Sequence, residues 1–366
     1  MSKMRVGNFA VVLFVGLAVI LAAQTSFGKT VAVGNCKAHL VSYSTISAAV
    51  AAAVPNSTVL VCPGTYPEQV TITQAITLRG LPDVTGAWPV IAVPSGGIVG
   101  GSGAQLSVQG TFELAIGPVS ISNLVVDGAA SGVDCSAGTL TGIQFFDVNG
   151  TLANVEVRNQ NPGGCGIGIS LNGGNFDPDF VNIRNGNIHD FDNTGILANS
   201  SGLSGFLVNL TSTTVKSSSP GVLAGVEYFF ADGTLEYNHI ILAGGTGLQL
   251  ENFYGFMNVR GNAIVGANIG ILSGTSEGGN LIVGNVLTNN GTGIAVSGLG
   301  GGAVVRSNNI LQSSVEAIEL DCSENSKVVS NTIFGAPVGV ADMNSGDTIK
   351  QNIFSSVNTL TTACSP

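Results

Sequence analysis

Residues 262–271 read NAIVGANIGI, and residues 285–294, 23 positions further on, read NVLTNNGTGI. Each segment begins with Asn, has an aliphatic residue two positions later and ends on Gly followed by Ile. The surrounding sequence is rich in Ile, Val, Thr and Gly and poor in helix-forming residues. A repeat of this length and composition predicts one turn of β-strands in a stacked solenoid, not a pair of helices.

The Gly-Ile end of this segment recurs between residues 142 and 340. In each copy an Ile, Val or Leu follows Gly, or once Ala, at Ile143, Ile167, Ile196, Val226, Leu248, Ile271, Ile294, Ile318 and Val340. The intervals are 24, 29, 30, 22, 23, 23, 24 and 22 residues. The two longer intervals indicate insertions near residues 172–180 and 211–220, which in a solenoid usually become loops on one face.

A ladder of Asn residues runs in phase with this repeat. Its members are Asn238, Asn262, Asn285, Asn308 and Asn331, spaced 24, 23, 23 and 23 residues apart. Five copies in a fixed relation to a second ladder are typical of stacked turns, in which each amide hydrogen-bonds to its equivalent on the next coil. We therefore interpret these Asn residues as structural.

The first coil needs a cover, because it would otherwise expose apolar interior and an unpaired strand edge. Residues 45–54 have helical composition, with Ser44 or Thr45 as a possible N-cap, and are expected to form this plug. Residues 58–62 then read as a buried strand, followed by the turn sequence GTYPE at residues 64–68. We expect Glu68 to satisfy backbone donors.

With this coil length, the Asn ladder and the GTYPE segment, the chain resembles the right-handed parallel β-helix superfamily, which includes pectate lyases, pectin methylesterases and polygalacturonases. The resemblance covers roughly residues 40–360. It implies an all-β fold, a single-stranded right-handed parallel β-helix solenoid with a short N-terminal capping helix. The catalytic signatures of these three enzyme families are absent, so the resemblance selects none of their activities.

The amino-acid composition limits the kinds of molecule that the protein is expected to bind. Of 366 residues only 9% are charged, against about 25% in an average soluble domain, and the net charge is −10. Lys and Arg form no cluster that could contact phosphates, which argues against nucleic-acid binding. The uninterrupted repeat favours one domain, expected to be a monomer.

The N-terminus reads as a signal peptide, because Lys3 and Arg5 precede an apolar run over residues 9–23 that is too short for a typical membrane span. An uncleaved anchor is the alternative. The expected organisation is a signal peptide at 1–28 and a β-helix domain at 29–366, with a cap at 36–62, coils at 63–355 and a tail at 356–366. We expect a secreted or cell-surface protein with no membrane span in the mature chain.

Six cysteines follow the predicted signal peptide, and an even number in an exported chain suggests disulfides. Fifteen connectivities are possible in principle. Local pairing is the simplest and would give Cys36–Cys62, Cys135–Cys165 and Cys322–Cys364.

Strand alternation directs the residue after each repeated Ile outward. Glu227 should therefore neighbour Gln249, with Glu251 diagonal to it at roughly 7–8 Å and Asn199 in the same outward row. Two carboxylates at about that separation suit inverting glycoside hydrolysis. We expect Glu227 and Glu251 as catalytic residues, with Gln249 and Asn199 as substrate-binding residues.

The first long interval brings further candidates. Asp177, Asp179, Asp190 and Asp192 could supply oxygen ligands to Ca²⁺, although solvated loop acids are the alternative. A polysaccharide lyase needs a base and a group that neutralises the substrate carboxylate. His189 is the candidate base, Arg184 and Arg260 are candidate neutralisers, and Tyr254 could stack on a sugar ring or pack under a loop.

Two functions follow from the sequence. The first is recognition, with lyase- or hydrolase-like cleavage, of an extracellular polysaccharide along the outward face near Glu227, Gln249 and Glu251. The second is a non-catalytic surface or matrix protein, such as an adhesin, supported by the scarcity of charged groups and the missing catalytic motifs. Whether the chain is an enzyme stays open, and Ca²⁺ is the candidate cofactor.

Overall fold

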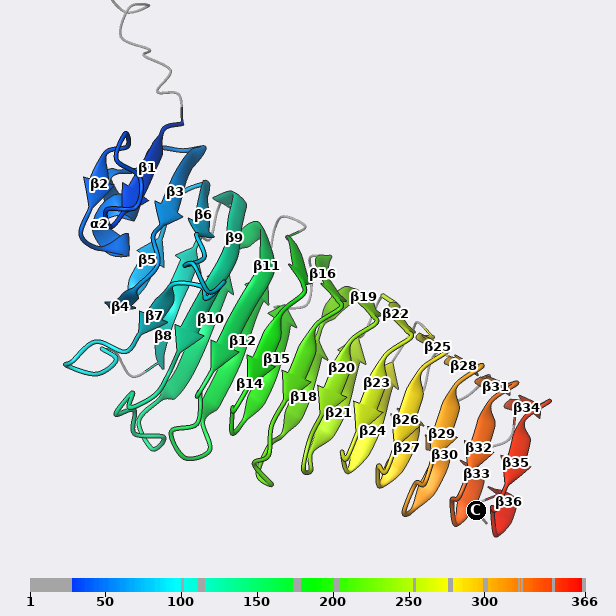
Figure 1. Cartoon of the computed structure of the whole chain (residues 1–366). Coiled ribbons are helices and arrows are strands. Elements are labelled where there is room, and N and C mark those ends of the chain that lie inside the picture. Colours follow the sequence, from blue (N-terminus) through cyan, green and yellow to red (C-terminus); the bar gives the residue numbers. More distant parts are fainter. Residues whose placement is uncertain are drawn as a thin grey trace, which may run out of the picture.

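The chain folds into a right-handed parallel β-helix, as the sequence predicts (Figure 1). The structure, a computed structural model, describes residues 28–99, 102–110, 116–173, 179–200, 205–252, 255–275, 279–298, 302–321, 323, 325–343 and 346–363. Several predictions lie outside the described residues: the signal peptide over residues 1–27, Asp177, Tyr254, Cys322 and Cys364.

One wall of the solenoid is a sheet of 12 parallel strands, here called sheet I. Its strands are β5 (Val70–Ile72), β8 (Ser102–Gln109), β10 (Thr139–Phe146), β12 (Gly166–Gly173), β15 (Thr194–Ser200), β18 (Ala224–Phe229), β21 (Thr246–Asn252), β24 (Ile269–Thr275), β27 (Thr292–Ser297), β30 (Glu316–Asp321), β33 (Val338–Asp342) and β36 (Thr359–Ala363).

The second sheet, sheet II, has 24 strands and forms the rest of each coil as two arms. The first strands are β1 (Thr30–Val33), β2 (Ser42–Tyr43), β3 (Ser57–Val61), β4 (Thr65–Pro67), β6 (Ile76–Gly80), β7 (Val90–Ala92), β9 (Ile116–Asp127) and β11 (Val148–Arg158). The first arm continues as β13 (Phe180–Arg184), β16 (Phe206–Thr211), β19 (Ala231–Glu236), β22 (Met257–Arg260), β25 (Leu281–Val283), β28 (Val304–Arg306), β31 (Lys327–Val329) and β34 (Thr348–Lys350). The second arm is β14 (Asn187–His189), β17 (Thr214–Lys216), β20 (His239–Ile241), β23 (Ala263–Val265), β26 (Val286–Thr288), β29 (Asn309–Leu311), β32 (Thr332–Phe334) and β35 (Ile353–Ser355).

The core fills the inside of the coil. Ile143, Ile196, Val226 and Ile294 of the predicted repeat are fully buried and aligned strand by strand in sheet I. One predicted copy is wrong: the register pairs Ile143 with Ile169, not with Ile167. The segment reads Gly-Ile-Gly-Ile, and a shift of two residues keeps the same face inward, so the sequence pattern alone could not separate the two.

The Asn ladder is confirmed at the corner between the two arms of sheet II. Asn262 donates its side-chain amide to Asn285 Oδ1 at 3.0 Å, Asn285 donates to Asn308 Oδ1 at 3.0 Å, and both donors are fully buried. The ladder extends one coil beyond the predicted members, to Asn352. The residue before each ladder Asn has a positive φ, for example 64° at Gly261, and this single residue turns the chain from one arm to the other.

The predicted capping helix is α2 (Ile46–Ala52), with Thr45 as its N-cap. Glu68 accepts from the backbone N–H groups of Ile46 at 2.7 Å and Ser47 at 2.9 Å, as predicted. The helix buries Ile46 and Val50 against the first coils and so covers the apolar interior. The disulfide Cys36–Cys62 ties this cap to β3.

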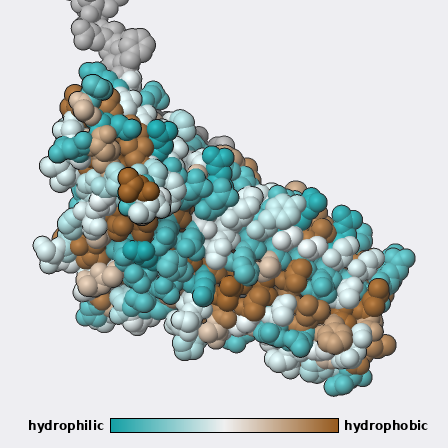
Figure 2. All heavy atoms as spheres, in the orientation of Figure 1, coloured by the Kyte–Doolittle hydropathy of each residue, from teal (hydrophilic) through white to brown (hydrophobic). Residues whose placement is uncertain are grey.

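The surface differs along the solenoid. Figure 2 shows mainly hydrophilic residues over the middle of the molecule and apolar residues over the C-terminal coils. The exposed apolar side chains of those coils include Phe334 and Ile353. No helix among the described residues is long and apolar enough to cross a membrane.

Candidate functional site

The outward face of sheet I carries two rows of side chains, mostly polar or aromatic, here called the ridge. One row aligns Gln144, Ser170, Leu197, Glu227 and Gln249 across β10, β12, β15, β18 and β21. The next row aligns Phe146, Asn172, Asn199, Phe229 and Glu251. The expected neighbours Glu227, Gln249 and Glu251 therefore lie together, and Asn199 is in the same row as Glu251.

Glu227, Gln249 and Glu251, here called the acidic triplet, interact with one another. Gln249 donates its side-chain amide to Glu251 Oε1 at 2.7 Å, which fixes the orientation of that carboxylate. Glu227 is partly buried in the sheet face. Burial, followed by the negative charge of Glu251, raises the pKa of Glu227 above the usual carboxyl range. Glu227 therefore holds its proton to a higher pH than an ordinary carboxyl group, and the hydrogen-bonded Glu251 lies next to it. Pairs of carboxyl groups in such different environments are found in acid–base sites.

The aromatic part of the ridge lies in the same row. Phe146 is 41% exposed, and Phe229 is partly exposed beside Glu251. The Phe229 ring meets Phe230 edge-on, with centroids 4.2 Å apart. Phe146 and Phe229 are three coils apart, about 14 Å at the usual strand spacing, with the amides of Asn172 and Asn199 between them.

Arg184 and Arg260 do not join the acidic triplet, because both lie on the first arm of sheet II. Arg184 lines a shallow hollow of about 380 Å³ together with Thr151, Asn182, Asn209 and Thr211. Arg260 is exposed beside Glu236 of the previous coil. The candidate groups for neutralising a substrate carboxylate therefore stand on a different wall from the candidate acids.

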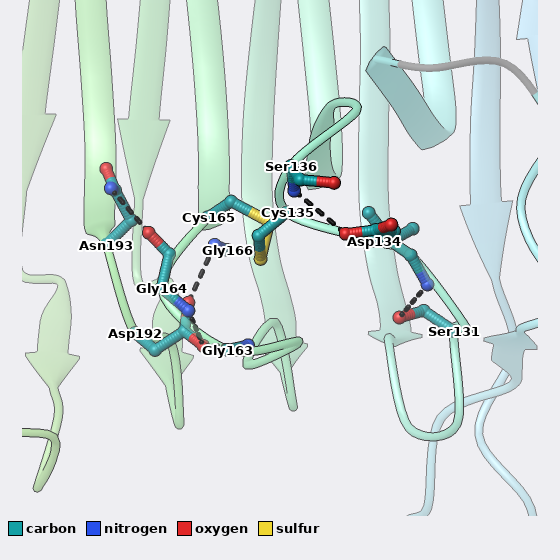
Figure 3. Close-up of a disulfide and its surroundings, with 11 residues drawn as sticks. Ser131, Asp134, Cys135, Ser136, Gly163, Gly164, Cys165, Gly166, Asp192 and Asn193 are labelled. Carbon is teal, nitrogen blue, oxygen red and sulfur yellow. Dashed lines mark hydrogen bonds between the residues drawn. A yellow bond between two sulfur atoms is a disulfide. The ribbon is translucent and has the colours of Figure 1, made fainter.

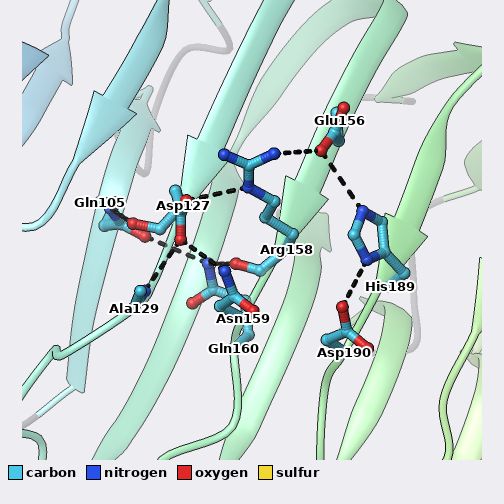
Figure 4. A network of polar contacts seen from close by, with 9 residues as sticks. All are labelled: Gln105, Asp127, Ala129, Glu156, Arg158, Asn159, Gln160, His189 and Asp190. Atoms are coloured by element: carbon cyan, nitrogen blue, oxygen red, sulfur yellow. Dashed lines mark hydrogen bonds and ion pairs between the residues drawn. The ribbon is translucent and has the colours of Figure 1, made fainter. Parts of the chain in front are cut away.

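His189 belongs to a polar network on the second arm of sheet II (Figure 4). Its Nδ1 is 2.7 Å from Asp190 Oδ2 and its Nε2 is 3.4 Å from Glu156 Oε1. Arg158 bridges Glu156 at 2.8 Å and Asp127 at 2.9 Å. Both ring nitrogens of His189 thus face carboxylates of sheet II, and the structure does not bring this His to the acidic triplet.

Sequence reasoning missed Asp127, Glu156 and Arg158 as members of this network. Asp127, Arg158 and His189 follow one another at intervals of 31 residues and occupy one register position on β9, β11 and β14. That spacing was the available signal, but these coils are longer than the 22–24-residue repeats and the interval is not obvious without the register.

Asp192 has a structural position (Figure 3). Its Oδ2 accepts from the backbone N–H groups of Gly163 and Gly164, each at 2.7 Å, and its Oδ1 accepts from Gly166 at 2.7 Å. The disulfide Cys135–Cys165, the second predicted pair, closes the same turn. Asp192 is thereby used to hold a glycine-rich turn in place.

The predicted calcium ligands among the described residues, Asp179, Asp190 and Asp192, lie at two different corners of one coil. Asp179 precedes β13, at the corner after sheet I, whereas Asp190 and Asp192 follow β14, at the corner before the next strand of sheet I. Among the described residues no group of three His, Cys, Asp or Glu side chains is arranged to hold a metal ion. One coil thus carries Asp179 to one end of its path and Asp190 and Asp192 to the other.

Comparisons with known proteins agree with the fold. Residues 234–364 match the family described as periplasmic copper-binding protein (NosD). No curated protein matches the sequence significantly.

Solved structures with similar folds include three with different reported roles. PfbA, a surface adhesin of Streptococcus pneumoniae, is 14% identical, with 85% of each chain covered and a TM-score of 0.58. A mannuronic acid-specific polysaccharide family 6 lyase from human gut microbiota is 11% identical, with 84% of this chain and 86% of that chain covered and a TM-score of 0.51. The A-module of the mannuronan C-5 epimerase AlgE6 of Azotobacter vinelandii is 17% identical, covers 84% and 94%, and has a TM-score of 0.50. These likenesses agree with the predicted right-handed parallel β-helix fold.

Proposed function

We propose that this protein is exported and binds an extracellular polysaccharide along the ridge of sheet I, with the acidic triplet as the centre of the site. The observation that carries the proposal is the contact within the triplet, Gln249 to Glu251 at 2.7 Å with Glu227 in register beside it. Two disulfides in the described residues are typical of an oxidising compartment and support export.

The ridge has the chemistry that sugar recognition needs. Carboxylate and amide oxygens accept hydrogen bonds from sugar hydroxyls, and amide N–H groups donate to them. Aromatic side chains such as Phe146 and Phe229 offer apolar faces to the C–H side of a sugar ring. Because every coil presents its side chains at the same two positions, the ridge is suited to a linear chain running along the solenoid axis.

The charges of the ridge favour a neutral polysaccharide over a uronate polymer. In the described strands β10, β12, β15, β18 and β21 there is no Lys, Arg or His, while Glu227 and Glu251 bring negative charge. A uronate chain would be repelled unless cations intervened. A lyase mechanism also lacks its neutralising group here, since Arg184 and Arg260 lie on sheet II.

Any cleavage at this site would be hydrolytic. Diagonal neighbours on adjacent strands are about 7–8 Å apart, and inverting glycoside hydrolases place their two carboxyl groups about 6.5–9.5 Å apart. Glu227, whose pKa is raised, would be the general acid and Glu251 the base that activates water.

A non-catalytic adhesin is the second candidate. It is favoured by the fold-level likeness to the pneumococcal surface adhesin and by the bond from Gln249, which occupies one oxygen of the candidate base. In that case the same ridge would bind glycan without turnover.

A panel of neutral and acidic polysaccharides tests both candidates. The mature protein would be assayed for retention on each glycan, for new reducing ends and for the absorbance of unsaturated products. Retention on neutral glycans with new reducing ends supports the hydrolase, and retention alone supports the adhesin. Unsaturated products, or a lack of binding to every glycan, would overturn the proposal.

A further inference from the structure

Two buried carboxyl groups, Asp147 and Asp179, lie on neighbouring coils at the corner where sheet I passes into sheet II. Asp147 is the single residue between β10 and β11, with φ at 50°. Asp179 immediately precedes β13, and β13 pairs with β11 as the corresponding strand of the next coil. Their exposed fractions are only 3% and 2%.

Backbone contacts fix the two coils side by side at this corner. The Asp147 N–H donates to the carbonyl oxygen of Asn172 at 3.0 Å. The Phe180 N–H, directly after Asp179, donates to Asn149 Oδ1 at 2.7 Å. These bonds hold the backbones that carry Asp147 and Asp179 next to each other.

The charge of Asp147 is not compensated by the described protein groups. Both of its carboxylate oxygens are buried, and neither has a hydrogen-bond partner in the described part of the chain. The basic side chains in the ion pairs found among the described residues are Arg158 and His189, and neither is paired with Asp147. Burial, together with the charge of Asp179, raises the pKa of Asp147. An ionised carboxylate in such a place is costly unless a counter-charge accompanies it.

We propose that Asp147 and Asp179 bind a hard divalent cation, with Ca²⁺ as the ion that fits. Two carboxylates balance its charge, and Ca²⁺ accepts oxygen ligands in flexible geometry, with backbone carbonyls and water completing its coordination. Soft or borderline metals are less suitable, because they favour sulfur and imidazole ligands. This site is separate from the acidic triplet and does not depend on the proposed glycan function.

The site would act as a clamp between two coils. Without a cation the two buried carboxylates repel each other, whereas a Ca²⁺ ion bound between them would attract both and so hold the two coils together at the corner that leads out of sheet I. The clamp lies at the end of β10 and β12, next to the row that contains Phe146 and Asn172. Binding of the ion should therefore stabilise the middle of the solenoid.

Isothermal titration of the chelator-treated mature protein with CaCl₂, followed by thermal unfolding with and without the ion, tests the inference. We expect saturable binding and a rise in the unfolding midpoint on the order of 5 °C at 100-fold excess over Kd. Asp147→Asn and Asp179→Asn should each weaken Ca²⁺ binding by about 100-fold or more.

Asp190→Asn is the matched control, because Asp190 also has a positive φ at a corner but pairs with His189. It should bind Ca²⁺ as the wild type does. Two results would overturn the inference. One is a wild-type protein whose unfolding midpoint does not change with Ca²⁺ and which gives no heat of binding in the titration, as expected if the two carboxyl groups share a proton. The other is loss of binding in Asp190→Asn with unchanged binding in Asp147→Asn.

Discussion

Replacing Asn285 by Ala should destabilise the solenoid far more than an ordinary Asn-to-Ala change. The Asn285 side chain makes four hydrogen bonds: it donates to Val259 O and Asn308 Oδ1, each at 3.0 Å, and accepts from the backbone and side-chain N–H groups of Asn262 at 2.9 and 3.0 Å. Alanine would remove all four from a site with no solvent exposure.

The magnitude follows from the groups left behind. Asn308 Oδ1 keeps one bond, because the backbone N–H of residue 285 still donates to it at 2.9 Å. Two groups of Asn262 lose their acceptor, namely its backbone N–H and one of its side-chain N–H groups, and the carbonyl of Val259 loses one donor. Each unsatisfied buried group costs about 1–3 kcal/mol, so the free energy of unfolding should fall by about 3–5 kcal/mol after partial entry of water.

Urea unfolding followed by far-UV circular dichroism measures this loss, and hydrogen exchange at the Asn262 amide reports it locally. Asn309→Ala is the matched control, because Asn309 is only partly buried and its Oδ1 has no hydrogen-bond partner in the described chain. The control should change stability by no more than about 0.5 kcal/mol. Equal losses in the two variants would refute the reasoning that the ladder stabilises the coils.

Three further predictions concern the cap, one turn and the ridge. Glu68→Ala should fray α2 and lower the free energy of unfolding by about 2 kcal/mol, because it removes charge-assisted hydrogen bonds to the first turn of the helix. Hydrogen exchange at the amides of Ile46 and Ser47 measures the effect, and unchanged protection of these amides would contradict it. Asp192→Ala should lower the free energy of unfolding in urea by about 2–4 kcal/mol, because three glycine N–H groups lose their acceptor. A loss no larger than that from replacing an exposed Asp by Ala would show that the turn does not depend on Asp192. Because the pKa of Glu227 is raised in the folded protein, the folded state holds that proton more tightly than the unfolded state. Stability should therefore fall as pH rises from the usual carboxyl range through the folded pKa, and Glu227→Gln should flatten this slope; an identical slope in both proteins would show that Glu227 does not contribute.

The sequence was sufficient for the architecture because the repeat carries its own register. The Asn ladder and the buried Ile residues report the same coil length twice, and a strict alternation sets which residues face inward. The exception is informative. At Ile167 and Ile169 the local Gly-Ile doublet satisfies both registers, so only the pairing with the neighbouring strands decides between them.

The candidate site was predictable only where coils are regular. Glu227, Gln249 and Glu251 follow from alternation and a 22-residue interval, and the structure places them as neighbours. The His189 network and the Asp147–Asp179 corner could not be foreseen in the same way. They join residues across longer coils, where the length of each turn determines which side chains meet.

The most direct test of the account is the affinity of the acidic-triplet variant for the polysaccharide that the wild type retains. The triple variant Glu227→Gln, Gln249→Ala, Glu251→Gln would be compared with Glu319→Gln, Asp321→Asn. The control pair occupies the same two outward rows of sheet I, three coils beyond Gln249 and Glu251. Kd should rise about tenfold or more in the triple variant and stay within about twofold of the wild-type value in the control. Wild-type affinity in the triple variant would contradict glycan recognition by the ridge.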